Sequence, residues 1–168
     1  MKTMETQKLM VAETVENDIS RIIEIEKSNS NFVGQYTFEE HKKVMLDNNG
    51  LHISVFDKRD NSLIGYIILL GLNNPNNSIE FRRIAISRKG LGYGKDAIKL
   101  VKSICFNKYK VHRLFLSVFS DNEVALKLYD SLGFQRDGLL RDCSLEGGRY
   151  RSMWSLSMLE TEYIYDLD

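Results

Sequence analysis

The sequence predicts an α/β protein whose central unit is a strand, a glycine-rich turn and a helix. Residues 78–86 read as a strand, and the residues after them alternate three glycines with larger side chains where an amphipathic helix pattern begins. Paired apolar runs, 51–56 with 63–70 and 134–144 with 149–159, indicate antiparallel hairpins on both sides of this unit. Strands and helices that alternate in this way predict the α/β class.

The composition excludes several classes of protein. A chain of 168 residues fits one domain, 1–168, and 43% hydrophobic residues suffice for a core. The 23 basic and 23 acidic residues cancel, so we expect no nucleic acid and no membrane surface as partner. No segment is apolar enough for a membrane span or a signal peptide, which indicates a cytoplasmic protein. Cys105 and Cys143 lack metal-ligand spacing, so no metal is expected.

The first two elements are a short strand and an amphipathic helix. Residues 9–12 predict the strand, and Asn17 or Asp18 can cap the helix that follows. Isoleucines at helical spacing form its apolar stripe. Glu24 and Glu26 are expected in solvent or at the edge of that stripe.

A second helix begins at a capping-box pattern. Thr37 and Glu40 have the T-x-x-E spacing of such a box, and the helix is expected to end near Asp47. His41 is expected at the surface or half-buried, because histidine is typically of intermediate burial.

The chain after the glycine turn predicts a helix, a central strand and another helix. Cys105 lies in the apolar stripe of the first helix, whereas Lys99, Lys102 and Lys108 are expected in solvent. Strand 112–118 is apolar on both faces, which indicates a central position in the sheet.

The last predicted helix follows this central strand. Ser120 to Glu123 form a capping-box pattern, and Gly133 is expected to end the helix. Its expected buried stripe consists of Val124, Ala125, Leu128 and Leu132.

The glycine-rich turn is predicted to bind a phosphate group. Glycine adopts positive φ without strain and lets the backbone approach a ligand closely. The N-terminus of the following helix offers unpaired N–H groups and a partial positive charge. Three kinds of phosphate-binding motif could contain such a turn, each with a different ligand. A turn that binds no ligand is a fourth possibility.

A Walker A loop matches the turn poorly. That loop requires Gly, four residues and then Gly-Lys-Ser/Thr. Gly94 and Lys95 are present, but Lys89 stands where the first glycine belongs. Asp96 stands where a hydroxyl would hold magnesium, so this interpretation is disfavoured.

A dinucleotide fingerprint matches better but lacks its context. Residues 92–97 fit G-x-G-x-x-A. The fingerprint also requires a carboxylate about 20 residues further on for the ribose. The next strand has none before Asp121, and the turn lies past the middle of the chain.

Two motifs together resemble the GNAT N-acetyltransferases. That family's turn has Arg or Gln, two residues, Gly, one residue, and Gly or Ala. Lys89-Gly90-Leu91-Gly92-Tyr93-Gly94 is similar, with Lys89 in place of Arg or Gln. Residues 122–134 look like the family's N-x-x-A-x-x-L-Y-x-x-x-G-F. Both motifs occur in the family's order and spacing, which makes the pair far more specific than either motif alone.

The resemblance implies both a fold and a cofactor site. The fold would be a mixed, mostly antiparallel sheet of six or seven strands, with helices on both faces. Strands 78–86 and 112–118 would be neighbours, parallel, and splayed around acetyl-CoA. The pantetheine would add to the backbone of Ile84, Ala85 and Ile86. The pyrophosphate would bind the N–H groups of Lys89, Gly90, Leu91, Gly92, Tyr93, Gly94 and Lys95.

The resemblance also assigns roles at the reacting centre. Tyr129 would protonate the departing thiolate as general acid, and Asn122 would hydrogen-bond the pantetheine arm. From helix position alone, a Tyr129 that packs at a helix edge with its hydroxyl satisfied is favoured, and the surrounding motif reverses this preference. Asn122 can alternatively cap a helix. Independently of the resemblance, Glu80 is the candidate base for the amine, because it is a carboxylate on the strand that leads into the turn. An ion pair of Glu80 with Arg82 or with a neighbouring strand is the alternative, and the residues do not decide between the two.

The implied activity is direct transfer of an acetyl group from acetyl-CoA to a primary amine. A protein N-terminus and a small amine such as a polyamine are both open as acceptors. A non-catalytic acetyl-CoA-binding or sensing domain is the alternative. The end of the chain resembles the ribosomal-protein and spermidine N-acetyltransferase branch loosely, with Ser152 where Asp is usual. The final hairpin is a possible homodimer contact.

Overall fold

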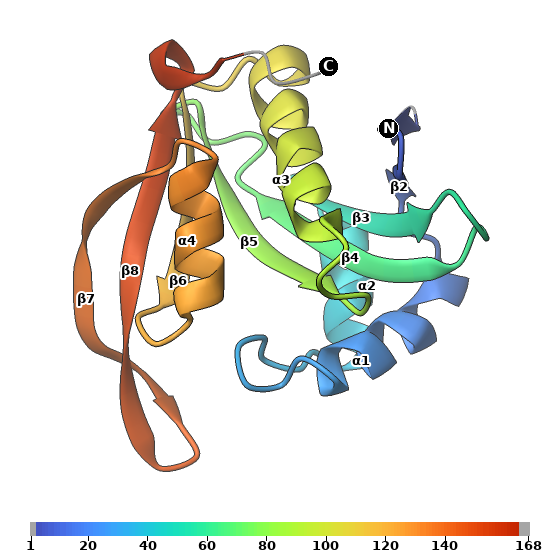
Figure 1. Ribbon diagram of the computed structural model, residues 1–168, viewed down its shortest axis with the longest axis horizontal. Helices are drawn as coiled ribbons and strands as arrows, with labels where there is room; N and C mark the ends of the chain where they lie inside the picture. Colours follow the sequence, from blue (N-terminus) through green and yellow to red (C-terminus); the bar gives the residue numbers. More distant parts are fainter. Residues whose placement is uncertain (1–2, 165–168) are drawn as a thin grey trace.

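The computed structural model describes residues 3–164 and forms a single mixed sheet with helices on both faces (Figure 1). The strand order is β1-β2-β3-β4-β5-β6-β8-β7. The strands are β1 (Met4–Glu5), β2 (Leu9–Glu13), β3 (Gly50–Asp57), β4 (Leu63–Leu70), β5 (Ser78–Ile86), β6 (Arg113–Phe119), β7 (Gln135–Glu146) and β8 (Arg149–Leu159). The α-helices are α1 (Ile19–Lys27), α2 (Phe38–Leu46), α3 (Tyr93–Ser103) and α4 (Glu123–Ser131). Two short 3₁₀ helices, η1 (Glu16–Asp18) and η3 (Glu160–Glu162), and a π-helix, η2 (Ile104–Lys108), which continues α3, complete the helical elements of residues 3–164.

The sheet confirms the predicted mixed topology with one strand more than expected. Every neighbouring pair is antiparallel except β5 and β6, which are parallel. The eighth strand is β1, a two-residue strand that pairs with β2. A segment this short and polar carries no apolar alternation, so the sequence gives no signal for it.

Helices cover both faces because the central strand β4 is apolar on both. Ile67 and Leu69 belong to the core that includes the α3 stripe. Tyr66 and Ile68, which alternate with them, belong to a second core with Ile22 and other residues of α1. Continuous apolar runs are the pattern of strands buried on both sides. The site between β5 and β6 is thus held by two packed layers of helices.

Strands β5 and β6 separate along their length. They pair over only three residues each, Ser78 to Glu80 opposite Arg113 to Phe115. Beyond Glu80, β5 keeps its pairing with β4 as far as Ile86 opposite Gly65. Figure 1 shows the resulting V-shaped divergence of the two strands, with α4 in front of β6 and α3 beside β5 on the same face of the sheet. The edge of β5 that faces β6 is therefore unpaired from Phe81 onward, as the predicted splay requires.

Helix α4 begins two residues later than the capping-box pattern predicted. Asn122, not Ser120, is the cap, and its side chain accepts a hydrogen bond from the Ala125 N–H. The predicted burial of Val124 is wrong, because this side chain is 81% exposed. Leu126 and Tyr129 are buried on the inward face instead.

The predicted solvation of Lys102 is also wrong. Its side chain is buried, and its ammonium donates to the Leu132 carbonyl at 3.0 Å. The ammonium also lies 5.7 Å from the centre of the Tyr163 ring. A buried lysine is tolerated where it is paired, and here the partner is the free carbonyl end of α4.

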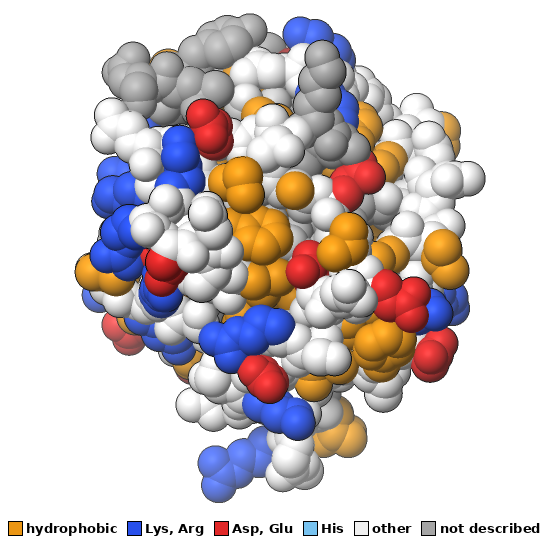
Figure 2. Space-filling model, turned by 90° about the vertical axis from the view of Figure 1, so that its right-hand side faces the viewer, with side chains coloured by type: hydrophobic (Ala, Val, Ile, Leu, Met, Phe, Trp, Pro, Cys, Tyr) orange, Lys and Arg blue, Asp and Glu red, His pale blue; other side chains and the backbone are white. Residues whose placement is uncertain are grey.

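The surface agrees with the balanced composition. On the face drawn in Figure 2, basic and acidic side chains lie beside one another around a central area of apolar side chains. Within residues 3–164, no helix combines the length and the apolar character needed to cross a membrane.

Candidate active site

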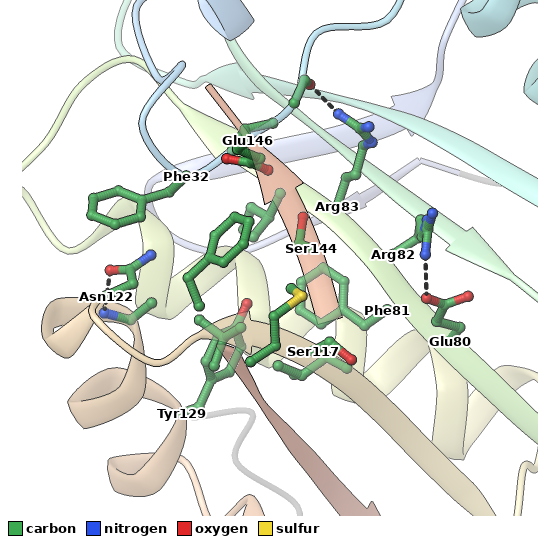
Figure 3. A pocket seen from close by; sticks show the side chains of 18 residues that line it. Phe32, Glu80, Phe81, Arg82, Arg83, Ser117, Asn122, Tyr129, Ser144 and Glu146 are labelled. Atoms are coloured by element: carbon green, nitrogen blue, oxygen red, sulfur yellow. Dashed lines mark hydrogen bonds and ion pairs between the residues drawn. The ribbon is translucent and has the colours of Figure 1, made fainter. Parts of the chain in front are cut away.

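A cavity of about 390 Å³ opens where β5 and β6 separate (Figure 3). Its walls come from β5, β6, the start of α4, the loop after α1 and the β7–β8 hairpin. These segments are far apart in the sequence, and the divergence of the two strands brings them to one place. The cavity is therefore a consequence of the sheet topology and does not depend on any single side chain.

Four of the predicted site residues line this cavity. Glu80 and Ile84 reach it from β5, and Asn122 and Tyr129 reach it from α4. Ala85 and Ile86 are not among its lining residues and continue β5 toward the glycine turn. The structure thus joins the candidate base and the candidate acid in one space.

Tyr129 is buried, with its hydroxyl directed into the cavity (Figure 3). Its ring meets Phe81 and Phe134 edge to face, with ring centres 6.2 and 5.4 Å apart. Within residues 3–164 the hydroxyl has no hydrogen-bond partner. Burial raises its pKa, so the phenol is protonated at neutral pH. A neutral, unpartnered O–H in a cavity is suited to donate a proton or a hydrogen bond.

Asn122 combines its structural role with a place on the cavity wall. Its Oδ1 accepts from the Ala125 N–H at 3.2 Å, which confirms the helix-cap interpretation. The cap fixes the side chain at the mouth of the cavity, where its amide nitrogen is a further donor. The hydrogen bond to pantetheine stays a prediction.

Glu80 is held by its neighbour on the same face of β5. Arg82 Nη1 donates to Glu80 Oε1 at 3.0 Å, and both side chains line the cavity. Residues two apart on a strand share a face, which explains the pair. The ion pair exists as anticipated, and the role as base stays a prediction.

The glycine turn has the geometry of an anion cradle. Gly90 and Gly92 have φ of +76° and +82°, and Gly92 is the N-cap of α3. A Cβ built on Gly90 would meet nothing within 4 Å, so the turn is open on that side. The N–H groups at the start of α3 have no partner within the helix. These residues therefore fit a pyrophosphate through their backbone.

The turn lies beyond the cavity rather than inside it. None of the lining residues of the cavity comes from the stretch 89–95. The Tyr93 side chain points into the core, where its hydroxyl donates to Asp57 Oδ2 at 2.6 Å. A ligand that spans both regions must extend along the unpaired edge of β5.

A buried polar network contradicts two expectations. Glu26 and His41 are both fully buried, although Glu26 was expected at the edge of the stripe and His41 near the surface. His41 Nε2 lies 3.5 Å from Glu26 Oε2, and His41 Nδ1 lies 2.9 Å from His52 Nε2. Tyr66 donates its hydroxyl to Glu26 Oε1. The network fills the space between α1, α2 and the sheet.

The same network supports one wall of the cavity. Glu26 Oε2 accepts from the Tyr36 N–H at 2.9 Å. Arg83 donates to the Gly34 carbonyl and lies 3.6 Å from Glu26 Oε1. Arg83, which Figure 3 labels, and Gly34 both line the cavity. Burial opposes the charge of Glu26, but the contacts with His41, Tyr66 and the Tyr36 N–H outweigh it and lower its pKa.

A second set of residues, which sequence reasoning missed, joins the β7–β8 hairpin to the loop after α1 and to the segment before α4. Arg151 on β8 donates to Glu146 at 2.9 Å, to Asp121 at 2.7 Å and to the Asn31 carbonyl at 3.0 Å. Its guanidinium lies 3.6 Å from the centre of the Phe119 ring. These partners are up to 120 positions away in the sequence, so no local pattern announces them. His52 did leave a signal, a titratable residue inside an apolar strand.

Comparisons with known proteins agree with this geometry. Residues 18–134 match the model of the acetyltransferase (GNAT) family. The spermidine N(1)-acetyltransferase of Vibrio cholerae is 28% identical over 82% of this chain and 86% of its own. The spermidine N(1)-acetyltransferase of Escherichia coli K12 is 27% identical over 81% of this chain and 78% of its own.

Solved structures show the same fold. The spermidine N-acetyltransferase from Vibrio cholerae in complex with CoA and spermine superposes with a TM-score of 0.84 at 23% identity, over 94% of this chain and 98% of its own. A dodecameric structure of that enzyme gives 0.82 at 24% identity, over 97% and 100%. Family match and fold agree with the two sequence motifs: the chain belongs to the GNAT family of acetyltransferases, acyltransferases that use acetyl-CoA.

Proposed function

We propose that this chain acetylates a polyamine by direct transfer from acetyl-CoA, with Tyr129 as general acid. One observation carries the proposal: the unpartnered Tyr129 hydroxyl and the Glu80 carboxylate line one cavity, at the place where β5 and β6 separate. A proton donor and a proton acceptor are the two groups that acyl transfer to an amine requires.

The cofactor would lie along β5 and end on the glycine turn. The backbone of Ile84, Ala85 and Ile86 belongs to the edge of β5 that β6 leaves unpaired, so a pantetheine amide could pair with it. The N–H groups of 89–95 and the positive end of α3 would hold the pyrophosphate. Asn122 would add a side-chain donor at the mouth of the cavity.

The proposed step has a simple proton balance. The neutral amine attacks the thioester carbonyl carbon, a C–N bond forms and the C–S bond breaks. Tyr129 donates its proton to the departing sulfur, and Glu80, directly or through water, receives the proton that the amine loses. Such proton transfers contribute typically about 10²- to 10⁴-fold each to the rate.

The acceptor assignment rests on the relatives and on the cavity's carboxylates. The relatives named above are spermidine N-acetyltransferases. In this chain Glu80 and Glu146 line the cavity and can receive ammonium groups, and Phe32 and Met153 offer apolar surface for a methylene chain.

The two arginines of the cavity favour a second candidate acceptor. Arg82 and Arg83 line the same space, so the cavity wall carries two cations beside its two carboxylates. An amine that also carries a carboxylate, such as an amino acid or a short peptide, would be recognised by such a mixed set. This acceptor class is the alternative to a polyamine.

Thiol release from acetyl-CoA tests the function with a matched panel. Spermidine and spermine are compared with a free-amine dipeptide, single amino acids and fully N-acetylated spermidine as the control that lacks an acceptor. The polyamines are expected to give the highest kcat/KM. Faster turnover with amino acids or the dipeptide would move the assignment to the second class. CoA binding without turnover on any amine would favour a non-catalytic acetyl-CoA-binding domain, and binding of NAD(H) but not CoA would overturn both.

A further inference from the structure

A buried carboxylate lies beneath the glycine turn. Asp57, the last residue of β3, is fully buried. Arg59 Nη2 donates to its Oδ2 at 2.8 Å, and the Arg59 N–H donates to its Oδ1 at 2.9 Å. The same Oδ2 accepts from the Tyr93 hydroxyl at 2.6 Å and from Arg88 Nη1. A single carboxylate oxygen thus joins three side chains.

Two of these partners stand at opposite ends of the turn. Arg88 directly precedes Lys89, and Tyr93 directly follows the N-cap Gly92. Arg88 is bonded a second time, because its Nη2 donates to Asp60 Oδ2 at 2.6 Å. The middle of the turn has its own anchor, since Lys8 Nζ donates to the Leu91 carbonyl at 3.2 Å.

We propose that Asp57 is a positioning residue that closes the glycine turn by binding Arg88 and Tyr93 at its two ends. With both ends joined to one buried group, the N–H groups between them keep a fixed direction without a ligand. Glycines at positive φ are otherwise free to reorient, and this freedom would have to be lost on binding. Asp57 therefore tightens the binding of CoA without touching it.

The arrangement favours positioning over direct contact with the phosphates. Arg88 is committed to Asp57 and Asp60, and Arg59 is committed to Asp57, so both cations already have carboxylate partners. The Tyr93 hydroxyl is buried and donates inward. The backbone of the turn, by contrast, is exposed at Gly90 and Gly92.

The inference rests on the proposed cofactor site, and Tyr93→Phe tests it with the least disturbance. This change removes one hydroxyl and leaves the ring and Asp57's two arginines in place. Without the hydrogen bond from this hydroxyl the free turn can reorient, and an ordering cost of about 1 kcal/mol that moves to the binding step corresponds to about a fivefold increase in the dissociation constant for CoA. KM for acetyl-CoA should rise by the same factor, while kcat at saturation and KM for the amine stay unchanged. Asp57→Asn should raise the dissociation constant further.

Ser157→Ala is the control. It also removes a buried hydroxyl that donates to a carboxylate, Asp137 Oδ1 at 2.8 Å, but it lies on β8 and does not line the cavity. Both variants should lose thermal stability, and only Tyr93→Phe should lose affinity for CoA by calorimetry.

Three outcomes separate the possibilities. Weaker CoA binding in Tyr93→Phe alone supports the inference, even if Asp57→Asn fails to fold. Equal CoA affinity in wild type and Tyr93→Phe overturns it and leaves Asp57 a role in stability only. Absence of CoA binding in the wild type would refute the cofactor site itself, and with it the inference.

Discussion

Arg82 and Glu80 form an ion pair on the wall of the cavity, with Arg82 Nη1 3.0 Å from Glu80 Oε1. The Arg82 side chain is 48% exposed and that of Glu80 is 27% exposed, so water reaches both. An exposed ion pair of this kind contributes about 0 to 1 kcal/mol to stability. A large effect of Glu80 on the reaction would therefore come from chemistry and not from folding.

Glu80→Gln is expected to lower kcat by about 100-fold if Glu80 receives the amine proton. The amide keeps the shape of the side chain but cannot accept a proton. Steady-state kinetics with acetyl-CoA and the best amine measure the effect. Glu146→Gln is the control, because it removes a carboxylate elsewhere on the wall. That variant should raise KM for the amine and leave kcat nearly unchanged. A wild-type kcat in Glu80→Gln would assign the proton to water.

Gly65→Ala is expected to destabilise the protein through the strand that carries the cofactor edge. A Cβ at Gly65 would lie 2.4 Å from the Ala85 carbonyl oxygen and 2.5 Å from Ile86 Cδ1. Overpacking of this kind costs about 1–3 kcal/mol, which lowers the melting temperature by roughly 2–12 °C for a domain of this size.

Gly138→Ala is the matched control for that change. Gly138 also lies in a strand, and a Cβ there would meet nothing within 4 Å. Its melting temperature should stay within about 2 °C of wild type. Equal melting temperatures for the two variants would show that β5 moves to accommodate the methyl group.

His52 is expected to make stability depend on pH. Burial and the neighbouring His41 lower its pKa from 6.5 to about 3. The unfolded chain binds a proton at His52 below pH 6.5 and the folded chain does not, so stability is full above that pH and falls toward pH 3. The slope from this group is about 1.4 kcal/mol per pH unit.

Urea unfolding at several pH values between 6.5 and 5 checks this slope. Ordinary carboxylates remain ionised between about pH 5 and 6.5, so the change in unfolding free energy over this range comes from histidine protonation. His52→Gln should be less stable at pH 7, because its contacts with His41 and Thr14 are disturbed, but its stability should change less with pH. The same slope in both proteins would show that His52 accepts a proton without unfolding.

The sequence predicted the elements that local patterns determine. Strand β5 was placed at its observed ends, 78 and 86, because its apolar run stops at a glycine turn. Thr37 was predicted to cap α2 by a capping box, and both bonds of that box are present. The second motif selected Tyr129 and Asn122, and Glu80 was selected as the carboxylate on the strand before the glycine turn. The fold brings all three to one cavity.

The wrong burial predictions for Glu26 and His41 concern side chains whose partners are distant in the sequence. Burial of Glu26 and His41 needs Tyr66, Arg83 and His52 as partners, and no local pattern reveals them. Val124 was misplaced for a different reason: the stripe was drawn through Val124, whereas the buried face of α4 is centred on Leu126 and Tyr129.

The central claim is that Tyr129 protonates the departing thiolate, and Tyr129→Phe tests it most directly. Acetyl transfer is measured for wild type and variant, alongside the dissociation constant for acetyl-CoA and the melting temperature. The account predicts a fall in kcat of about 100-fold or more, with the dissociation constant within about threefold. The melting temperature should not fall, because the hydroxyl has no partner among residues 3–164 to lose. A variant with wild-type kcat would contradict the claim, because the proton would then have another source.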